Sequence, residues 1–307
     1  CSYNLQSTFA ALSFYNPDTT PWIIGAVEAV LVGYCLLGGG KRVIKATSTL
    51  VPLMGVIYIS VAFILTIMHI NLVPGVVGRI FAEAFDFTAI FGGFAGSCMM
   101  FGIKRGLYSN EAGVGSAPNA AAAADVSHPV KQGLVQMLSV FIDTLLICTA
   151  TAFMCLSSGI EPTKELAGAP YVQAALAASM GDYAKLFITV SMVLFAFTTL
   201  LGNLYYVDNA FAYVLKHVPG KTFTLCYRIL ACVLIFIGAG SSMGTMWDLA
   251  DVTMGFMAII NLPVICILGG PALRALDDYT EQRDAGKNPE FKASKIGLTQ
   301  KLDYWQD

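Results

Sequence analysis

The chain has 307 residues, of which 56% are hydrophobic and only 12% are charged, and its formal net charge is −2 at pH 7. Soluble globular domains carry about 25% charged residues, so lipid is a better solvent for this chain than water. Without a basic stripe the sequence offers no surface for nucleic acid. The eight cysteines form no CxxC pair and only three histidines occur, so neither a metal site nor a disulfide framework is indicated.

The first segment, residues 1–15, predicts the end of a helix that is already in progress. It begins with Cys1 and shows no signal-peptide pattern. We therefore expect a fragment of a longer chain whose first helices are missing.

Seven later stretches approach the roughly 20 apolar residues that a membrane-spanning helix needs. They are 22–39, 51–70, 89–103, 133–157, 184–207, 225–243 and 249–270. We predict an all-α, polytopic transmembrane bundle over residues 1–273, followed by a polar cytoplasmic tail, 274–307. Buried helices of a soluble protein are a less favoured explanation, because the stretches share a similar length.

The positive charges support a membrane topology. If segment 1–15 ends outside, fifteen of the eighteen Lys and Arg residues fall in segments that face the cytoplasm. Cytoplasmic loops of membrane proteins carry such an excess. The bias therefore predicts the orientation of the seven spans and supports their number.

The glycine-rich part of the third stretch, residues 92–97, predicts a break in a membrane helix. Glycine lets a ligand approach the backbone, and transporters hold a substrate's charged ends on the freed groups of broken helices. Close helix packing through small residues explains the same pattern. The residues alone leave both interpretations open.

Two adjacent hydroxyls occur in the middle of the fifth stretch, where Thr198 and Thr199 are followed by Asn203. With a loosened backbone carbonyl they would supply the oxygen ligands that hard cations such as Na⁺ prefer. In membrane helices, however, a threonine hydroxyl commonly bonds to the carbonyl one turn earlier. From the residues alone we favour this second interpretation.

Two carboxylates lie inside apolar stretches, Glu28 in the first and Asp143 in the fourth. A charge at the centre of a membrane helix costs about 2.5–3.5 kcal/mol on insertion scales. These residues could carry protons or hold a cation, but we favour a role in bracing neighbouring helices. Asp248 and Asp251 are expected near a helix start, where the helix dipole favours negative charge.

Segment 109–118, SNEAGVGSAP, follows Lys104 and Arg105 on the inner side. It lacks the GxxxxGK[ST] pattern and a preceding strand, so it does not predict nucleotide binding. We expect a tight, partly helical segment that links two spans.

The chain closely resembles the alanine/glycine:cation symporter family, the sodium:alanine symporters, in RGLYSNEAGVGSAPNAAAAA at 105–124 and in HPVKQGLVQMLSVFIDTLLICTATA at 128–152. Shorter matches occur in the family's order. They are LGGGKRVIKAT at 37–47, LVPLM at 50–54 and FAFTTLLG at 195–202. The resemblance covers nearly the whole chain. It implies the inverted-repeat fold of leucine-type sodium symporters, with ten core helices of which the seven stretches would be helices four to ten.

The resemblance also implies binding roles for particular residues. Those expected to bind substrate are Gly92, Gly93, Phe94, Ala95 and Gly96 of an unwound helix six, with Gln6 and Asn203. Those expected to bind Na⁺ are Thr198, Thr199 and the carbonyl of Phe195. Many members of the family carry Trp at the position of Asn203, so this residue would alter the shape of the pocket.

On this resemblance we expect symport of a small neutral amino acid, alanine or glycine, with Na⁺ across the cell membrane, and no enzymatic activity. A proton-coupled or passive transporter of the same fold is the alternative. A membrane enzyme is disfavoured because no suitable Ser/His pair or spaced aspartates occur in the spans. A purely structural subunit is a further alternative. The missing amino-terminal helices would complete both sites, so we expect this fragment alone not to transport.

Overall fold

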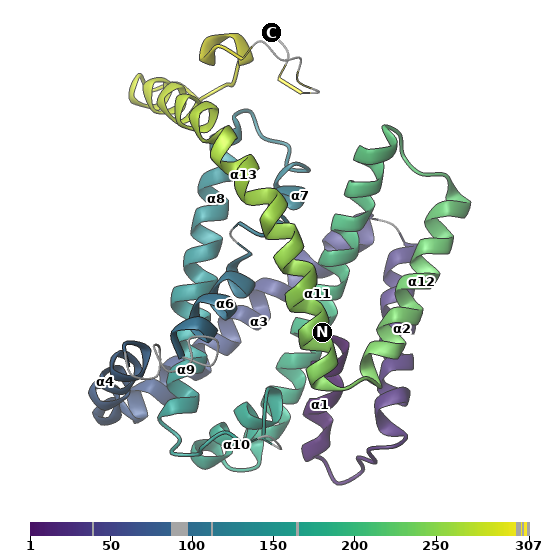
Figure 1. Ribbon diagram of the computed structural model, residues 1–307, viewed down its shortest axis with the longest axis vertical. Helices are drawn as coiled ribbons and strands as arrows, with labels where there is room; N and C mark the ends of the chain where they lie inside the picture. The colour runs from purple at the N-terminus through teal and green to yellow at the C-terminus, as the bar shows by residue number, and fades with distance from the viewer. Residues whose placement is uncertain are drawn as a thin grey trace. The chain divides into compact units, whose positions relative to one another are not determined.

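The computed structural model describes residues 1–38, 40–86, 98–111, 113–163 and 166–298, together with residues 302, 304 and 305. The regular structure of these residues is helical, which confirms the predicted all-α class (Figure 1). The chain divides into two compact units. The first unit is Cys1–Gly102 with Leu146–Ala250, and the second is Ile103–Leu145 with Asp251–Asp307.

The helices are labelled as in Figure 1. Those within the first unit are α1 (Ser2–Ser7), η1 (Thr8–Ala11), α2 (Thr20–Leu37), α3 (Gly40–Met68), η2 (Ile70–Leu72), α4 (Val73–Ala84), α9 (Thr149–Leu156), α10 (Ala169–Met180), α11 (Tyr183–Leu215) and α12 (Lys221–Ala239). Those within the second unit are α7 (Ala117–Ala121), α8 (Pro129–Phe141) and η5 (Ala293–Ile296). Three elements continue from one unit into the other: α6 (Cys98–Asn110), a π-helix (Ile142–Cys148) and α13 (Met243–Asp284).

Six helical stretches among the described residues are long and apolar enough to cross a membrane. They are Thr20–Leu37, Thr47–Met68, Pro129–Leu156, Tyr183–Leu215, Lys221–Ala239 and Met243–Asp284. Each matches one of the predicted stretches, and the remaining one, 89–103, lies mostly outside the described residues. Many large apolar side chains on these helices are exposed, as at Val30, Ile260 and Ile267, which is the arrangement that contact with lipid favours.

Helices α2 and α12 lie side by side in the first unit (Figure 1). Small residues allow this close approach: a Cβ atom added at Gly25 would lie 2.6 Å from Cβ of Ala239, and one at Gly240 would lie 2.4 Å from ring atoms of Trp22. In lipid, helices associate through such tight packing. The absent side chains of these glycines therefore set the spacing of the pair.

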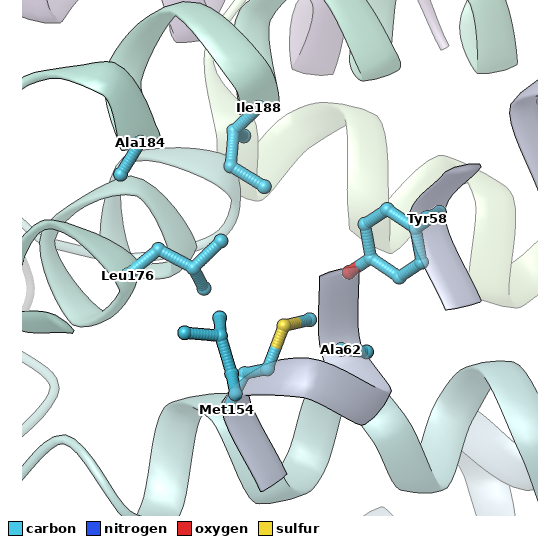
Figure 2. Packing of buried hydrophobic residues seen from close by; sticks show 7 residues of the cluster. Tyr58, Ala62, Met154, Leu176, Ala184 and Ile188 are labelled. Carbon is cyan, nitrogen blue, oxygen red and sulfur yellow. The ribbon is translucent and has the colours of Figure 1, made fainter. Parts of the chain in front are cut away.

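A second packed cluster joins α3, α9, α10 and α11 in the first unit. Figure 2 shows its side chains converging. The buried members are Tyr58, Ala62, Leu65, Met154, Leu176, Ala184 and Ile188. The hydroxyl of Tyr58 shares a hydrogen bond of 2.8 Å with Oγ1 of Thr151, so the polar atom that this cluster buries is paired.

In the second unit, α13 continues beyond residue 270 to Asp284, so the polar segment 274–307 begins as helix. The chain then turns back and packs on the carboxyl end of α13. The small core formed there contains Ala275, Phe291, Ala293 and Ile296, with Val130 of α8 packed against it.

Fully buried His128 lies at the centre of this turn. Its Nε2 is 3.3 Å from Oδ2 of Asp278, its Nδ1 accepts a hydrogen bond from the backbone of Val130, and its ring meets Phe291 and Tyr279 edge to face at 5.2 Å. The backbone N–H of Phe291 also donates to the carbonyl of Ser127. The segment that follows α13 is thus tied to the residues that precede α8.

Acidification is predicted to loosen this turn. Burial lowers the pKa of His128 below its usual 6.5, although the bond to Asp278 acts in the opposite direction and Lys131 and Lys295 add to the lowering. Because the folded state binds the proton more weakly than the unfolded state, the neutral ring stabilises the turn above about pH 6.5 and this stability falls as the pH drops below that value. We therefore expect lower protection factors for the amides of residues 286–298 at about pH 5.5 than at about pH 7.5, where a protection factor is the intrinsic exchange rate at that pH divided by the observed rate.

His128→Gln is the control, since its side chain does not titrate. Its amides over residues 286–298 should have lower protection factors than those of the wild type at the higher pH, and these protection factors should change little between the two pH values. A wild-type protein in which residues 286–298 are equally protected at both values would contradict the role of His128.

Candidate functional site

The predicted substrate-binding stretch lies outside the described residues. This applies to Gly92, Gly93, Phe94, Ala95 and Gly96, whose roles stay predictions. The other predicted site residues all lie in the first unit. They are Gln6 on α1 and Phe195, Thr198, Thr199 and Asn203 on α11.

Helix α11 runs through Phe195–Thr199 without interruption, so the predicted loosening of the backbone at this point is wrong. Both hydroxyls bond to carbonyls of their own helix. Oγ1 of Thr199 donates to the carbonyl of Phe195 at 2.7 Å, and Oγ1 of Thr198 lies 2.9 Å from the carbonyl of Leu194 and 3.1 Å from that of Phe195. Because such bonds satisfy the hydroxyls within the helix and no proline interrupts it, the backbone ladder persists.

The same bonds gather three oxygen atoms within one turn. Each hydroxyl has a single hydrogen and keeps lone pairs that can accept or ligate. The carbonyl of Phe195 is the shared partner of both threonines. The cluster has the hard oxygen chemistry that suits Na⁺, while the observed back-bonds are those that threonines adopt without any ion.

One face of α11 carries polar side chains within an apolar span. Phe195, Thr199 and Asn203 are four residues apart and therefore share a face, and Thr199 and Asn203 are exposed. Polar side chains in a membrane helix usually face protein or a water-filled path, because hydrocarbon cannot pair them. Thr198 is buried instead and lies 4.0 Å from Sδ of Met54 on α3.

Helix α3 also positions the ring of Phe195. Tyr58 meets it edge to face, with ring centroids 5.6 Å apart, and Tyr58 is held by its bond to Thr151. The neighbouring residues Phe197, Leu200 and Leu204 pack against the core of Val32, Leu36, Leu201 and Ile235. The polar turn is thus supported on two sides by packed side chains.

Gln6 is buried near the end of α1, where its Oε1 accepts a hydrogen bond of 2.8 Å from the hydroxyl of Tyr15. A polar cluster nearby was not predicted from the sequence. Nε2 of Gln173 on α10 donates to the carbonyl of Thr8 at 2.8 Å and to Oγ1 of Thr189 at 3.0 Å. The available signal was a single glutamine in the alanine-rich run 169–180.

In the second unit, the segment after α6 packs against α13. Gly113 and Gly115 adopt positive φ angles of 89° and 104°, which favour glycine. The side chain of Asn261 donates to the carbonyl of Gly113 at 3.1 Å, and a Cβ added at Gly115 would lie 3.0 Å from Cγ of Asn261. The glycines of the motif are therefore required by both backbone conformation and close helix contact.

Asp251 of α13 pairs with two basic residues of α6. Arg105 holds both of its carboxylate oxygens, at 2.9 and 3.3 Å, and Nζ of Lys104 lies 2.5 Å from Oδ2. The expectation that Asp251 lies at a helix start is wrong, because α13 begins at Met243. Its position is explained by these ion pairs.

Asp143 lies in the π-helix that follows α8 and accepts a hydrogen bond of 2.7 Å from Oγ of Ser109. This contact agrees with the bracing role expected for Asp143. The π-helix itself was not predicted. Such local widenings of a helix frequently occur at functional sites.

Among the described residues, six helical stretches long and apolar enough to cross a membrane, with exposed apolar faces, define a multi-pass α-helical membrane protein. The sequence profile of the sodium:alanine symporter family matches residues 2–293. The chain belongs to that family.

Named relatives agree with this assignment. The chain is 42% identical over 285 residues to the amino-acid carrier protein AlsT of Bacillus subtilis, covering 93% of this chain and 60% of the relative. It is 37% identical to the sodium/proton-dependent alanine carrier protein of Bacillus sp. PS3 (99% and 71%) and 38% identical to the sodium/alanine symporter AgcS of Methanococcus maripaludis (87% and 59%). The chain spans about 60–65% of the length of several relatives it matches.

Asp251→Asn is predicted to release the motif segment from α13. The change removes the negative charge that holds Lys104 and Arg105, and hydrogen bonds to charged groups contribute about 1.5–3 kcal/mol each. We expect amide exchange over residues 104–116 to become at least about tenfold faster, since 1.4 kcal/mol corresponds to a factor of ten.

Asp248→Asn is the matched control, because Asp248 is exposed and lies on the same helix. It should leave exchange over residues 104–116 unchanged. Equal effects of the two substitutions would show that the ion pairs do not hold the segment.

Proposed function

We propose that the protein imports a small neutral amino acid, alanine or glycine, together with Na⁺. The observation that carries this proposal is a set of polar groups on α11. The oxygens of Phe195, Thr198 and Thr199 and the side chain of Asn203 occur within an apolar spanning helix. Family membership supports it, and AgcS is named a sodium/alanine symporter. No covalent chemistry is required.

Na⁺ would bind where the two threonine hydroxyls and the Phe195 carbonyl meet. The ion would take lone pairs of the hydroxyls and compete with their bonds to the helix carbonyls. Because the oxygens already lie within 3.1 Å of the shared carbonyl, binding needs rotation of two side chains and no refolding. Further ligands would come from chain segments that this sequence does not contain.

The amino acid is a small zwitterion and needs partners for both charged ends. The glycine-rich residues Gly92–Gly96 would offer backbone groups, and Phe94 an aromatic wall. Gln6 and Asn203 would add amide groups that can donate and accept. Small substrates fit this set because it contains few bulky polar groups.

Coupling follows if the two ligands prefer the same conformation. Na⁺ bound at Thr198 and Thr199 would favour the outward-open state, and the amino acid would then bind that state more tightly. A ligand shifts such an equilibrium only through its differential affinity for the two states. The excess of Lys and Arg on one side supports a cytoplasmic location for the motif segment and for the polar tail.

Proton coupling is the alternative for the driving ion, since the relative from Bacillus sp. PS3 is named a sodium/proton-dependent carrier. Passive conduction is a second alternative. Accumulation of the amino acid against its concentration gradient distinguishes these alternatives from sodium symport. Proton coupling would need a proton gradient for accumulation, and passive conduction would give no accumulation.

Uptake into liposomes containing the full-length protein tests the function. An inward Na⁺ gradient should drive labelled alanine above its external concentration, and replacing Na⁺ by K⁺ should abolish the accumulation. Equilibration without accumulation would favour a passive facilitator, and accumulation driven by a pH gradient alone would favour proton coupling.

Thr199→Ala in the full-length protein should weaken sodium activation more than it weakens expression. Loss of one oxygen ligand is expected to raise the half-saturating Na⁺ concentration by roughly tenfold, which corresponds to about 1.4 kcal/mol. Thr66→Ala is the control, because Oγ1 of Thr66 makes the same kind of back-bond, to the carbonyl of Ala62 on α3. An unchanged sodium activation curve for Thr199→Ala would remove this residue from the site.

A further inference from the structure

Glu28 lies in the middle of the spanning helix α2. At 1.5 Å per residue it is about 12 Å from the first residue of the helix and about 14 Å from the last. The side chain is 4% exposed. A carboxyl group at this depth has left water entirely, so its partners determine which protonation state it can hold.

If Glu28 is ionised, its contacts with Ser2 and Ile235 contain one hydrogen atom too few for every contact to be a hydrogen bond. Oγ of Ser2 on α1 lies 2.5 Å from Oε2 of Glu28 and 2.9 Å from the carbonyl of Ile235 on α12. A serine hydroxyl has one hydrogen and can donate it to one of these acceptors. With an ionised carboxylate, three oxygens would share that single hydrogen.

A proton on Oε2 completes the chain of hydrogen bonds. Glu28 then donates to Ser2, and Ser2 donates to the carbonyl of Ile235, so each contact has its own hydrogen. The proton thereby links α1, α2 and α12 through one continuous chain. The structure fits the neutral carboxyl group better than the carboxylate.

The other oxygen of Glu28 supports the neutral form. Oε1 is buried and has no hydrogen-bond partner among the described residues. An unpaired carbonyl oxygen costs about 1–3 kcal/mol, whereas an unpaired carboxylate oxygen costs far more. Loss of the proton would place a charge on an atom that nothing pairs.

Glu28 also lines a cavity of about 480 Å³ in the first unit. Its remaining walls are apolar and include Leu5, Phe9, Val27, Leu31 and Phe197. Glu28 is the one ionisable residue among the lining residues of this cavity. The lining surface of this cavity is apolar, so the carboxyl oxygens would reach it only when the contacts with Ser2 open.

Charged partners that could hold an ionised Glu28 lie elsewhere on the helices packed against α2. Arg228 of α12 is bonded to Asp208 of α11 and to the carbonyl of Leu36, and Cys232 lies beside Gly33. On the α1 side, the amino group of Cys1 interacts with Glu28 through its charge. In a chain extended beyond Cys1 that nitrogen would be a neutral amide. Among the described residues, Glu28 forms no ion pair with a basic side chain.

We propose that Glu28 is a membrane-embedded proton-binding site and that it makes transport sensitive to protons. It takes one proton from water, which converts the carboxylate to the neutral acid and closes the chain from α1 to α12, and returns that proton to water when the chain opens. The transport part rests on the proposed function, and the proton-binding part does not.

The first experiment tests proton binding without transport. Infrared spectra of the full-length protein in lipid at neutral pH should contain the C=O stretch of a buried protonated carboxyl group, and Glu28→Gln should remove it. Ser2→Ala should shift this band without removing it, because the acid loses its acceptor. Glu83→Gln is the matched control, since Glu83 is exposed and paired with Arg79, and it should leave the band unchanged. Absence of a band that depends on Glu28 would overturn the proposal.

The second experiment tests the link to transport. Sodium-driven alanine uptake by the wild type, measured from about pH 5 to about pH 9, should depend on pH, and Glu28→Gln should lose this dependence while Glu83→Gln retains it. Glu28→Gln keeps the shape of a neutral side chain, and a thermal unfolding curve of the purified variant verifies that it folds. A pH dependence of Glu28→Gln identical to that of the wild type would overturn the role in transport. If the wild type takes up no alanine, the proposed function fails while the infrared band still decides whether Glu28 binds a proton.

Discussion

Hydrocarbon pairs no hydrogen bond, and this constraint explains where the polar side chains of the protein lie. Within the spanning helices a polar atom must find a partner in its own helix, in a neighbouring helix or in a wet cavity. Thr198 and Thr199 use carbonyls of α11, Tyr58 uses Thr151, and Asp143 uses Ser109. Glu28 meets this requirement only in part, because its Oε1 has no hydrogen-bond partner among the described residues.

Helix α13 connects the polar contacts of the second unit. Asp251 holds the basic residues of α6, Asn261 holds the glycine segment, and Asp278 contacts His128 near the turn that follows α13. At 1.5 Å per residue these three positions lie about 15 and 26 Å apart along an ideal helix. A movement of α13 would therefore be felt by both the motif segment and the polar tail.

The sequence predicted those features that depend on composition over about 20 residues, namely the spans, the all-α class and the charge bias. It did not predict contacts between distant segments. Asp251 was misplaced because α13 begins at Met243, six residues before the predicted stretch 249–270, so Asp251 lies beyond the first two turns of the helix. The short helices α4 and α10, which lie between spans, were missed because neither is long enough to give a spanning signal.

For the candidate site, the sequence located the residue types but not their bonding. The pair Thr198 and Thr199 was identified, yet hydroxyl chemistry fits both an ion site and back-bonding, and only the folded structure shows that α11 stays continuous there. The buried Gln173 was missed because nothing in its neighbours along the chain marks it as polar core. The protonation of Glu28 likewise could not be predicted from the sequence, because it is inferred from contacts with Ser2 and Ile235, which are far from Glu28 along the chain.

The central claim is that the polar face of α11 lines a water-filled path occupied by the amino acid and its driving ion. Its most direct measurement is the labelling of Asn203→Cys by a membrane-impermeant thiol reagent, in full-length protein whose reactive native cysteines have been replaced. The account predicts labelling that Na⁺ and alanine together suppress, while Val190→Cys, at an exposed apolar position of the same helix, stays unlabelled. Failure of Asn203→Cys to react, or labelling that is indifferent to both ligands, would contradict the account.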